Sequence, residues 1–576
     1  MASNFNRFYE QELANLRTLA TEFSKANPAI APMLSSSSND PDVERLLEGV
    51  AFLNGLTLQK IDDQLPEIAQ NLNQLLFPQI LQPIPAATIM AFTPKSGMRE
   101  LAVIKAGTEI ASIEVDGTSS IFRTIAELFV PPMSLESVIS EVASDGGKSI
   151  KLTFVGASDD GTPPVPSNVS LFLGDDYPIA AYLFMLLMNH TISIRMSDDM
   201  GSVVTVPHRL TAPAFDQALI VCPINSLPSL RLIQEYFFMP EKFLFVQLPD
   251  LSQYHEKFTG RRLHVEICFD TSKNVQIELT ANSFLMNVVP AVNLFKHSAE
   301  PIRLDHKSHS YRVLPEGKTK DHYQVFSVDQ VVGYRQGEPE PQIYETFIKM
   351  GNRHDESVNL YRITLKPSVL SDDIDTYLSV IYKSTQLPVD ETLSIDLTCT
   401  NNALPNSLLI GDVSRPTSSS PERFTYTNIR PVVPKVDPEA GEHLVWSSVA
   451  NLSLNFLTLS SVENLKSLLG NYNCSTSTDH AAKAANERRI NGLIDMTATR
   501  ESRVSEGALV HGQHIKITCT LNNFAGLGDL YLFGSVLEHF LASYSGINSY
   551  TRLEIFDTIS GTTFTWPMRL GNRPLL

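Results

Sequence analysis

The sequence has few cysteines, and none of them is paired in a C-x-x-C motif. Secreted proteins with structural disulfides and thiolate metal sites both need cysteines that are paired or closely spaced. The pattern therefore predicts a reducing compartment, and we expect a cytoplasmic protein. The five cysteines of the 576 residues are Cys222, Cys268, Cys399, Cys474 and Cys519.

Long apolar segments are also missing. The longest apolar run, Ile179–Met188, has ten residues, whereas a helix needs about 20 to cross a bilayer. The amino terminus carries acidic side chains where a secretion signal needs an apolar segment. We therefore expect no export through such a signal and no direct membrane insertion.

Positive charge is scarce relative to negative charge. The chain has 45 lysines and arginines against 63 acidic residues, which gives a formal net charge of −18. A protein that binds duplex nucleic acid needs a clustered basic face for the phosphates. The charge balance argues against nucleic acid as a partner and favours other proteins.

Motifs for catalysis and cofactor binding are lacking as well. The segment Gly146-Gly147-Lys148-Ser149 has Val142 where a phosphate-binding loop needs its first glycine, and a strand instead of a helix is expected after it. No serine lies in a G-x-S-x-G sequence. These absences favour a protein that is not an enzyme and that binds no cofactor.

One group of histidines leaves a metal-dependent hydrolase open as an alternative. His297, His306 and His309 are close in sequence, and imidazoles can converge on zinc. Their spacing is not that of two ligands on one helix face, and lysines and arginines crowd the same segment. We favour polar loop or interface roles for the three histidines and expect no bound metal.

Apolar periodicity predicts a helical region over residues 1–85. In the opening helix, large apolar side chains recur every three or four residues and therefore share one face. A region of this size has too small a core to bury every apolar stripe that it carries. We predict that this face is an assembly surface. Its candidate residues are Phe5, Phe8, Leu13, Leu16 and Phe23.

Prolines are expected to divide this helical region. Asn27-Pro28 should end the first helix, because proline disfavours helical geometry in the residue before it. A second helix is predicted from about Pro41 to Leu58, and a third from Pro66 to about Phe77.

After Pro85 the pattern changes to short runs of β-forming residues separated by glycine, proline and aspartate. We interpret Pro405–Pro438 as a long exposed excursion. The fold class is therefore α+β, an elongated multidomain chain of several small β-rich domains behind an N-terminal helical region. The expected divisions are a β-rich domain with a buried helix at 86–215, central β-rich domains at 216–400, the excursion and a mixed α/β region at 401–504, and a C-terminal α+β unit at 505–576.

Several segments, in collinear order over nearly the whole chain, resemble one family. They are Asp42–Glu48, Phe77-Pro78, Ala106–Glu109, Arg231–Phe245, Val292–His306, Leu397–Asn401 and Ile547–Ser549. In this order they are similar to the TssF baseplate proteins of bacterial type VI secretion systems. No single segment is as specific as a zinc signature, but their order is.

The resemblance implies a structural subunit without catalytic activity. TssF proteins look like the wedge proteins of contractile phage tails: two copies join one TssG, and six wedges would surround the VgrG spike and support sheath assembly. It also implies contacts with TssK, which links the baseplate to the inner-membrane complex, with TssE, which links it to the sheath, and with neighbouring wedges. A wedge protein of a contractile phage-like particle that is not a secretion system remains an alternative.

The C-terminal unit supplies a second candidate surface. A predicted helix at Leu530–Tyr544 and a predicted hairpin ending at Trp566 enclose the segment with Tyr550 and Arg552. Tyrosine and arginine are frequent in binding hot spots. By resemblance to wedge proteins, this unit would contact the neighbouring wedge, and we predict Tyr550 and Arg552 as its interface residues. The alternative is that the unit only caps the preceding β domain.

Overall fold

The computed structural model describes most of the chain, with gaps. The chain divides into two compact units, Met1–Leu76 with Glu439–Val449 and Phe77–Pro438 with Ala450–Leu576. The α+β fold class is confirmed, with an N-terminal helical region followed by β-rich sheets. The described residues are 2–27, 41–95, 98–142, 147–157, 165–207, 209–223, 226, 228–270, 279–317, 320–335, 340–347, 359–368, 373–381, 389–438, 444–445, 461–473, 480–505, 508–543, 545–546 and 549–571.

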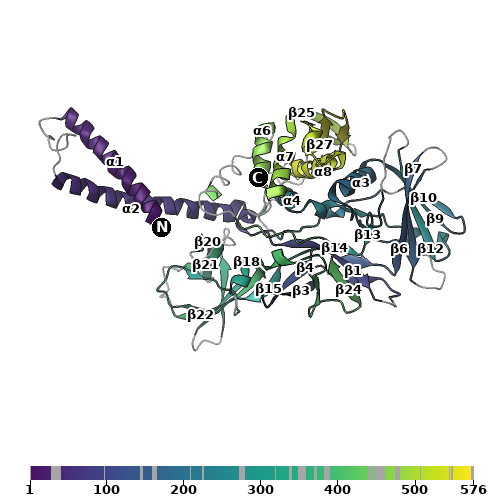
Figure 1. The fold of residues 1–576 in the computed structure, drawn as a ribbon, viewed down its shortest axis with the longest axis horizontal. Helices are drawn as coiled ribbons and strands as arrows, with labels where there is room; N and C mark the ends of the chain where they lie inside the picture. The colour runs from purple at the N-terminus through teal and green to yellow at the C-terminus, as the bar shows by residue number, and fades with distance from the viewer. Residues whose placement is uncertain are drawn as a thin grey trace. The chain divides into compact units, whose positions relative to one another are not determined.

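Two long helices form most of the first unit (Figure 1). α1 spans Ala2–Ala26 and α2 spans Pro41–Leu76. α1 ends just before Asn27-Pro28, as predicted. The prediction of a separate third helix from Pro66 is wrong, because α2 continues through that residue. A proline inside a helix removes one backbone hydrogen bond, and α2 nevertheless runs on to Leu76.

One sheet of the second unit joins the start of the β-rich region to residues far along the chain. β1 (Ala87–Pro94) pairs antiparallel with both β14 (Val288–Val292) and β24 (Phe424–Asn428). The order of the six strands is β23-β3-β4-β14-β1-β24. The other three strands are β3 (Glu109–Val115), β4 (Thr118–Thr124) and β23 (Val413–Pro416).

This sheet contradicts the interpretation of Pro405–Pro438 as an exposed excursion. β23 and β24 come from that segment, and Val413, Phe424 and Tyr426 are buried in a hydrophobic core. Proline is tolerated because β23 is an edge strand that ends at Pro416. The low apolar content of the segment reflects strands that are short and buried mainly on one side.

A five-stranded antiparallel sheet has the order β10-β9-β12-β7-β6. Its inner face is apolar: Leu152 and Phe154 of β7 and Val265 of β12 are fully buried. A three-stranded sheet, β11-β8-β13, and a two-stranded one, β2-β5, lie in the same unit. Their strands are β2 (Ala102–Ile104), β5 (Leu128–Val130), β6 (Met133–Val142), β7 (Lys148–Gly156), β8 (Ser170–Phe172), β9 (Thr191–Asp198), β10 (Val203–Val206), β11 (Phe245–Gln247), β12 (Arg262–Phe269) and β13 (Leu285–Met286).

An eight-stranded sheet has a hydrophobic core of its own, which includes Phe295, Tyr344, Leu393 and Leu397. Its order is β15-β22-β18-β19-β20-β21-β17, and β16 also pairs with β22. The strands are β15 (Phe295–Ser298), β16 (Ile302–Leu304), β17 (Tyr311–Arg312), β18 (Gln324–Arg335), β19 (Gln342–Thr346), β20 (Asn359–Pro367), β21 (Ile374–Ile381) and β22 (Glu391–Thr400).

Helix α8 (Leu527–Ser543) lies at the centre of the main core and contacts both α3 (Tyr177–Asn189) and α4 (Pro228–Phe238). The backbones of α8 and α3 come very close, because a Cβ on Gly528 would lie 2.2 Å from the Tyr182 nitrogen. None of the helices that the structure describes is both long and apolar enough to cross a membrane.

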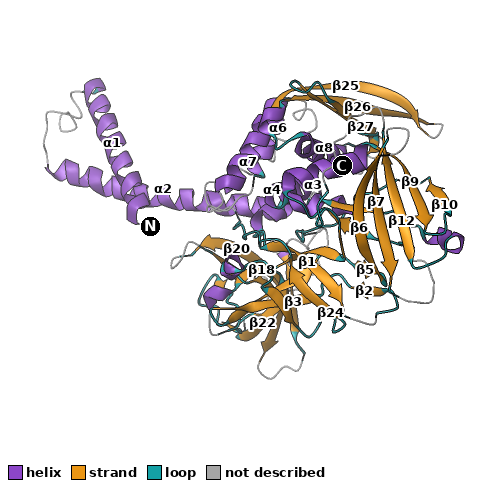
Figure 2. Ribbon diagram, turned by 45° about the vertical axis from the view of Figure 1, so that its right-hand side comes forward, coloured by secondary structure: helices purple, strands orange, loops and turns teal. Residues whose placement is uncertain are grey.

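The C-terminal sheet lies over α8 (Figure 2). β25 (Leu493–Ser505) and β26 (Ala508–Cys519) form an antiparallel hairpin, and β27 (Ser549–Asp557) pairs parallel with β26. β28 (Thr563–Thr565) pairs antiparallel with β27, which confirms the predicted C-terminal hairpin. The other elements here are α6 (Val462–Asn471), α7 (His480–Asn491) and β29 (Arg569–Leu570).

The sheets combine strands from different divisions expected from the sequence. β12, which follows residue 215, lies between β7 and β9, which precede it. β24, which follows residue 400, pairs with β1. The expected boundaries at residues 85, 215, 400 and 504 stay a prediction, but the segments between them share sheets.

Candidate interaction surfaces

The helix pair of the first unit buries almost no apolar side chain of its own. Among the side chains described on α1 and α2, the buried apolar ones are Ala51 and Ala69. The helices are also joined by an ion pair between Arg17 and Glu44, both of them substantially exposed. An exposed ion pair contributes only about 0–1 kcal/mol to stability. The pair therefore lacks a substantial core of its own.

Large apolar side chains are instead exposed along both helices. On α2, Leu46, Val50 and Leu53 follow one another at spacings of four and three residues, which places them on one face. Covering such a face with protein would be favourable by about 25 cal/mol for each Å² removed from water. The eleven exposed side chains are Leu19, Phe23, Leu46, Val50, Phe52, Leu53, Leu56, Ile68, Leu72, Leu75 and Leu76.

Of the five predicted surface residues of α1, Phe23 belongs to this exposed set. Phe23 is 51% exposed, whereas Phe8, Leu13 and Leu16 are half-buried. The side chain of Phe5 lies outside those that the structure describes. Most of the exposed apolar side chains are on α2, which we did not predict as a surface. The three- and four-residue spacing in α2 marks an apolar stripe, but it does not say whether the chain covers that stripe.

The aromatic segment that begins at Arg231 forms part of the main core. Tyr236, Phe237 and Phe243 are almost fully buried. The Tyr236 ring lies 5.7 Å from that of Phe533 on α8, measured between centroids. These rings are packed inside the protein, which leaves them unable to stack on a ligand at the surface.

A buried ion pair fixes the loop that precedes this segment. Lys242 and Glu235 are fully buried and in contact, and Lys242 also donates to the Gln217 carbonyl. The other Glu235 oxygen, Oε1, accepts hydrogen bonds from the backbone nitrogens of Leu219 at 2.8 Å and Ile220 at 2.9 Å. Burial lowers the pKa of Lys242, although the Glu235 carboxylate opposes this shift. The pair is structural, because every partner named is part of the same core.

Asp529 of α8 joins its own helix to three others under the C-terminal sheet. It is 1% exposed and accepts hydrogen bonds from the hydroxyls of Tyr177, at 2.6 Å, and Tyr236, at 3.3 Å. The Arg489 Nε atom donates to it at 3.0 Å. Burial raises the pKa of both tyrosines, so that they donate as neutral phenols. This network holds α3, α4, α7 and α8 in fixed positions and thereby supports the sheet above them.

Tyr550 lies on β27, and its predicted role at an interface stays a prediction. Its side chain is fully buried in the chain, and its ring lies against Gly512 of β26, where an added Cβ would be only 2.5 Å from the ring. The glycine leaves space that the ring fills. Arg552, two residues further on β27, is half-buried, and its role at an interface stays a prediction.

The outer face of the C-terminal sheet carries alternating charges. On β26, Lys516 Nζ lies 3.3 Å from a carboxylate oxygen of Glu554 on β27, and His514 Nε2 lies 3.1 Å from its other oxygen. On β25, Arg503 pairs with Glu501 at 2.6 Å. This face is therefore a polar surface with both charge signs.

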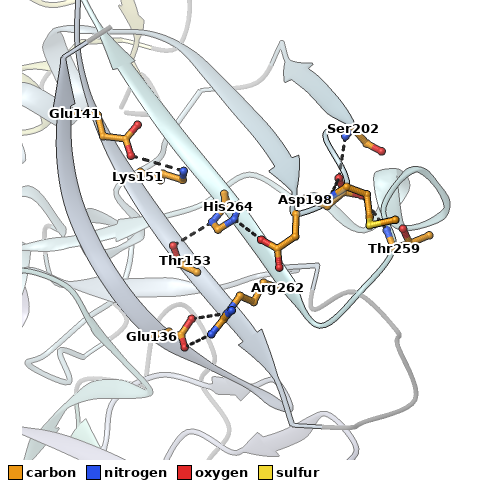
Figure 3. A network of polar contacts seen from close by, with 11 residues as sticks. Glu136, Glu141, Lys151, Thr153, Asp198, Ser202, Thr259, Arg262 and His264 are labelled. Carbon is orange, nitrogen blue, oxygen red and sulfur yellow. Dashed lines mark hydrogen bonds and ion pairs between the residues drawn. The ribbon is translucent and has the colours of Figure 1, made fainter.

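The outer face of the five-stranded sheet is a second polar surface, shown in Figure 3. Arg262 of β12 holds Glu136 of β6 through two hydrogen bonds, at 2.9 and 2.8 Å. His264 lies between Thr153, at 3.1 Å, and Asp199, at 3.0 Å. The bonds from Arg262 lower the pKa of Glu136. Alternating polar residues in β7 and β12 were a signal for this face that we did not use.

The three candidate metal-binding histidines have different surroundings. His297 Nε2 donates to the Glu316 carbonyl at 2.6 Å, and His306 Nε2 donates to the Val389 carbonyl at 2.7 Å. His309 is exposed. In the part of the chain that the structure describes, no three His, Cys, Asp or Glu side chains gather in a way that would hold a metal ion.

Comparison with known proteins gives a consistent result. The family model "Type VI secretion system, TssF" matches residues 1–573. The chain is 26% identical to the Type VI secretion system component TssF1 of Pseudomonas aeruginosa, over 99% of each chain.

Two structures are similar to the chain. A chain in a cryo-electron microscopy structure of the type VI secretion system TssK-TssF-TssG baseplate subcomplex has a TM-score of 0.78 at 26% identity, covering 93% of this chain and 99% of its own. A chain in a structure of the type VI secretion baseplate complex has a TM-score of 0.62 at 24% identity, covering 99% and 100%, and so shares the fold. With the family match over residues 1–573, these likenesses show that the chain belongs to the TssF family of type VI secretion systems.

Proposed function

We propose that this chain is a structural subunit of a type VI secretion baseplate and has no catalytic activity. The observation that carries the proposal is the apolar surface of α1 and α2, which has eleven exposed large apolar side chains and almost no buried ones. A surface of this kind marks a protein interface. The similar TssF chain in the TssK-TssF-TssG subcomplex supports TssG and TssK as partners.

In the proposed assembly, two copies of the chain join one TssG through the helix pair. Helices with wide apolar stripes form bundles when several chains contribute them, and the helix pair has unburied stripes of this type. Six such wedges surround the VgrG spike, contact TssE and neighbouring wedges, and support sheath assembly. The complex forms in the cytoplasm and docks on the inner-membrane complex through TssK.

Substitutions on α2 test this proposal. Leu46→Glu with Leu53→Glu places charges on side chains that are 70% and 64% exposed, so the chain should fold normally. The double variant should no longer co-purify with co-expressed TssG, whereas the wild-type complex should have the mass of two copies to one TssG. The matched control is Leu409→Glu, at a side chain that is 72% exposed in the second unit. Retention of TssG by the double variant would contradict the proposal.

Deletion of residues 2–26 tests the predicted face of α1 separately. We expect the shortened chain to remain folded and to lose wedge formation. Aggregation of the shortened chain would instead assign this face to the chain's own core. Circular dichroism and size-exclusion chromatography distinguish these outcomes.

Two observations separate the alternatives. Genes for TssK-like and TssM-like proteins beside this one would favour secretion, and capsid and tail-fibre genes would favour a contractile particle. Stoichiometric zinc or manganese in the purified protein would favour a metal-dependent hydrolase.

A further inference from the structure

β25 is a long edge strand in the C-terminal sheet. It spans thirteen residues, Leu493–Ser505, whereas the mean strand has about 5–6. Among the described residues it pairs only with β26, so its other edge has no strand partner. It contains neither proline nor lysine, which commonly protect an edge from pairing with another chain. Its irregularity is confined to one register shift, between Leu493 and Asp495.

The side chains along this edge are accessible. Asp495, Thr497, Thr499 and Arg503 are exposed, and Glu501 is half-buried. These five residues alternate along the strand and therefore lie on the same face of the sheet. An added strand would place its own outward side chains directly opposite them, with Cβ atoms about 4.5–5.5 Å apart.

The charges of β25 are complementary to a second copy of the same strand. If two copies pair antiparallel about an axis at Thr499, each Asp495 lies opposite Arg503 of the other copy. An axis at Ala498 places Asp495 opposite Glu501, which is a repulsive pair. An axis at Arg500 leaves Asp495 and Arg503 opposite uncharged residues. Opposite charges across strands stabilise pairing, and like charges oppose it. The sequence of the strand thus favours one register.

We propose that β25 pairs antiparallel with β25 of a second copy, centred on Thr499, and that this joins two C-terminal sheets into one. The proposal rests on the proposed function, in which each wedge contains two copies of the chain. It assigns the contact between those copies to an interface that repeats the same residues on both sides. The Glu501 and Arg503 pair, at 2.6 Å within one strand, would gain Asp495 of the other copy as a further acceptor.

A cysteine at the axis tests the register. Thr499→Cys places two thiols opposite each other, close enough for a disulfide. The matched control is Thr497→Cys, an exposed threonine on the same strand face. In the proposed register the two copies of residue 497 lie roughly 13 Å apart, too far for a disulfide. The wild-type chain controls for the native cysteines.

Mild oxidation of each variant in complex with TssG gives the readout. We expect a covalent dimer for Thr499→Cys and at least about tenfold less for Thr497→Cys. Equal crosslinking of the two variants, or none in a complex whose mass shows two copies, would overturn the pairing and leave the proposed wedge intact. If the mass of the complex with TssG instead corresponds to a single copy of this chain, the proposed stoichiometry is contradicted.

Reversing the charges of Arg503 and Asp495 in the Thr499→Cys variant gives a second test of the register. Arg503→Asp places Asp opposite Asp and should reduce the covalent dimer about tenfold. The added change Asp495→Arg restores opposite charges and should restore crosslinking. Loss of crosslinking in Arg503→Asp without recovery in the double variant would also overturn the register.

Discussion

The two compact units of the chain are stabilised in different ways. The second unit has a continuous core in which side chains such as Leu532 and Phe540 are fully buried. In the first unit, α1 and α2 expose side chains of the same kind, for example Leu46. Apolar side chains of the same kind are therefore covered by the chain itself in the second unit and stay exposed on the helix pair of the first.

The largest expected effect is at Asp529 in the second unit. Asp529→Ala leaves the buried Arg489 guanidinium without its carboxylate, and breaking a buried ion pair in this way costs about 3–5 kcal/mol. Urea unfolding, followed by the fluorescence of buried Trp566 in a Trp446→Phe background, measures the change. A loss below about 1 kcal/mol would mean that the network does not support this unit.

A leucine-to-alanine substitution in each unit compares how much a leucine side chain stabilises the two units. Leu532→Ala removes a fully buried side chain and should lower the free energy of unfolding by about 2–5 kcal/mol. Leu46→Ala removes one that is 70% exposed and should change it by less than about 0.5 kcal/mol. Denaturant titrations of both variants without TssG give the comparison. Similar losses would show that α2 is buried within the free chain.

The smallest expected effect is at the polar face of the second unit. Arg262 lowers the pKa of Glu136 below its unfolded value. The contribution of this pair is therefore present above about pH 4.5 and is lost as the pH falls through the lowered pKa. Between about pH 3 and 6, the urea midpoint of Glu136→Gln should change slightly less with pH than that of the wild-type chain. An unchanged acid dependence would show that the pair does not contribute to stability.

Local patterns predicted some elements well. The end of α1 was predictable from Asn27-Pro28, since proline acts on its immediate neighbour. α8 was predictable from its apolar run, and the β27–β28 hairpin from the Ser560-Gly561 turn between its strands. In each case the residues that decide the structure are adjacent in sequence.

Other features depend on partners that are distant in sequence. Pro405–Pro438 has the composition of a loop. Its strands were not recognised, because the strands β1 and β3 that pair with them lie about 300 residues earlier. Tyr550 resembles a surface hot spot, but its environment is set by Gly512 on a neighbouring strand. The exposed apolar face of α2 was missed for a different reason: periodicity identifies an apolar stripe without saying whether the chain itself covers it.

The position of β1 in its sheet has a consequence for synthesis on the ribosome. The hydroxyl of Thr425 on β24 donates to the carbonyl of Thr93 on β1, a partner 332 residues earlier in the chain. At about 5–20 residues per second, roughly 20 to 60 seconds separate the translation of these two strands. During that interval β1 emerges with one edge unpaired and open to incorrect pairing. Correct folding of the nascent chain therefore depends on keeping this edge of β1 free of other strands until β24 has been made.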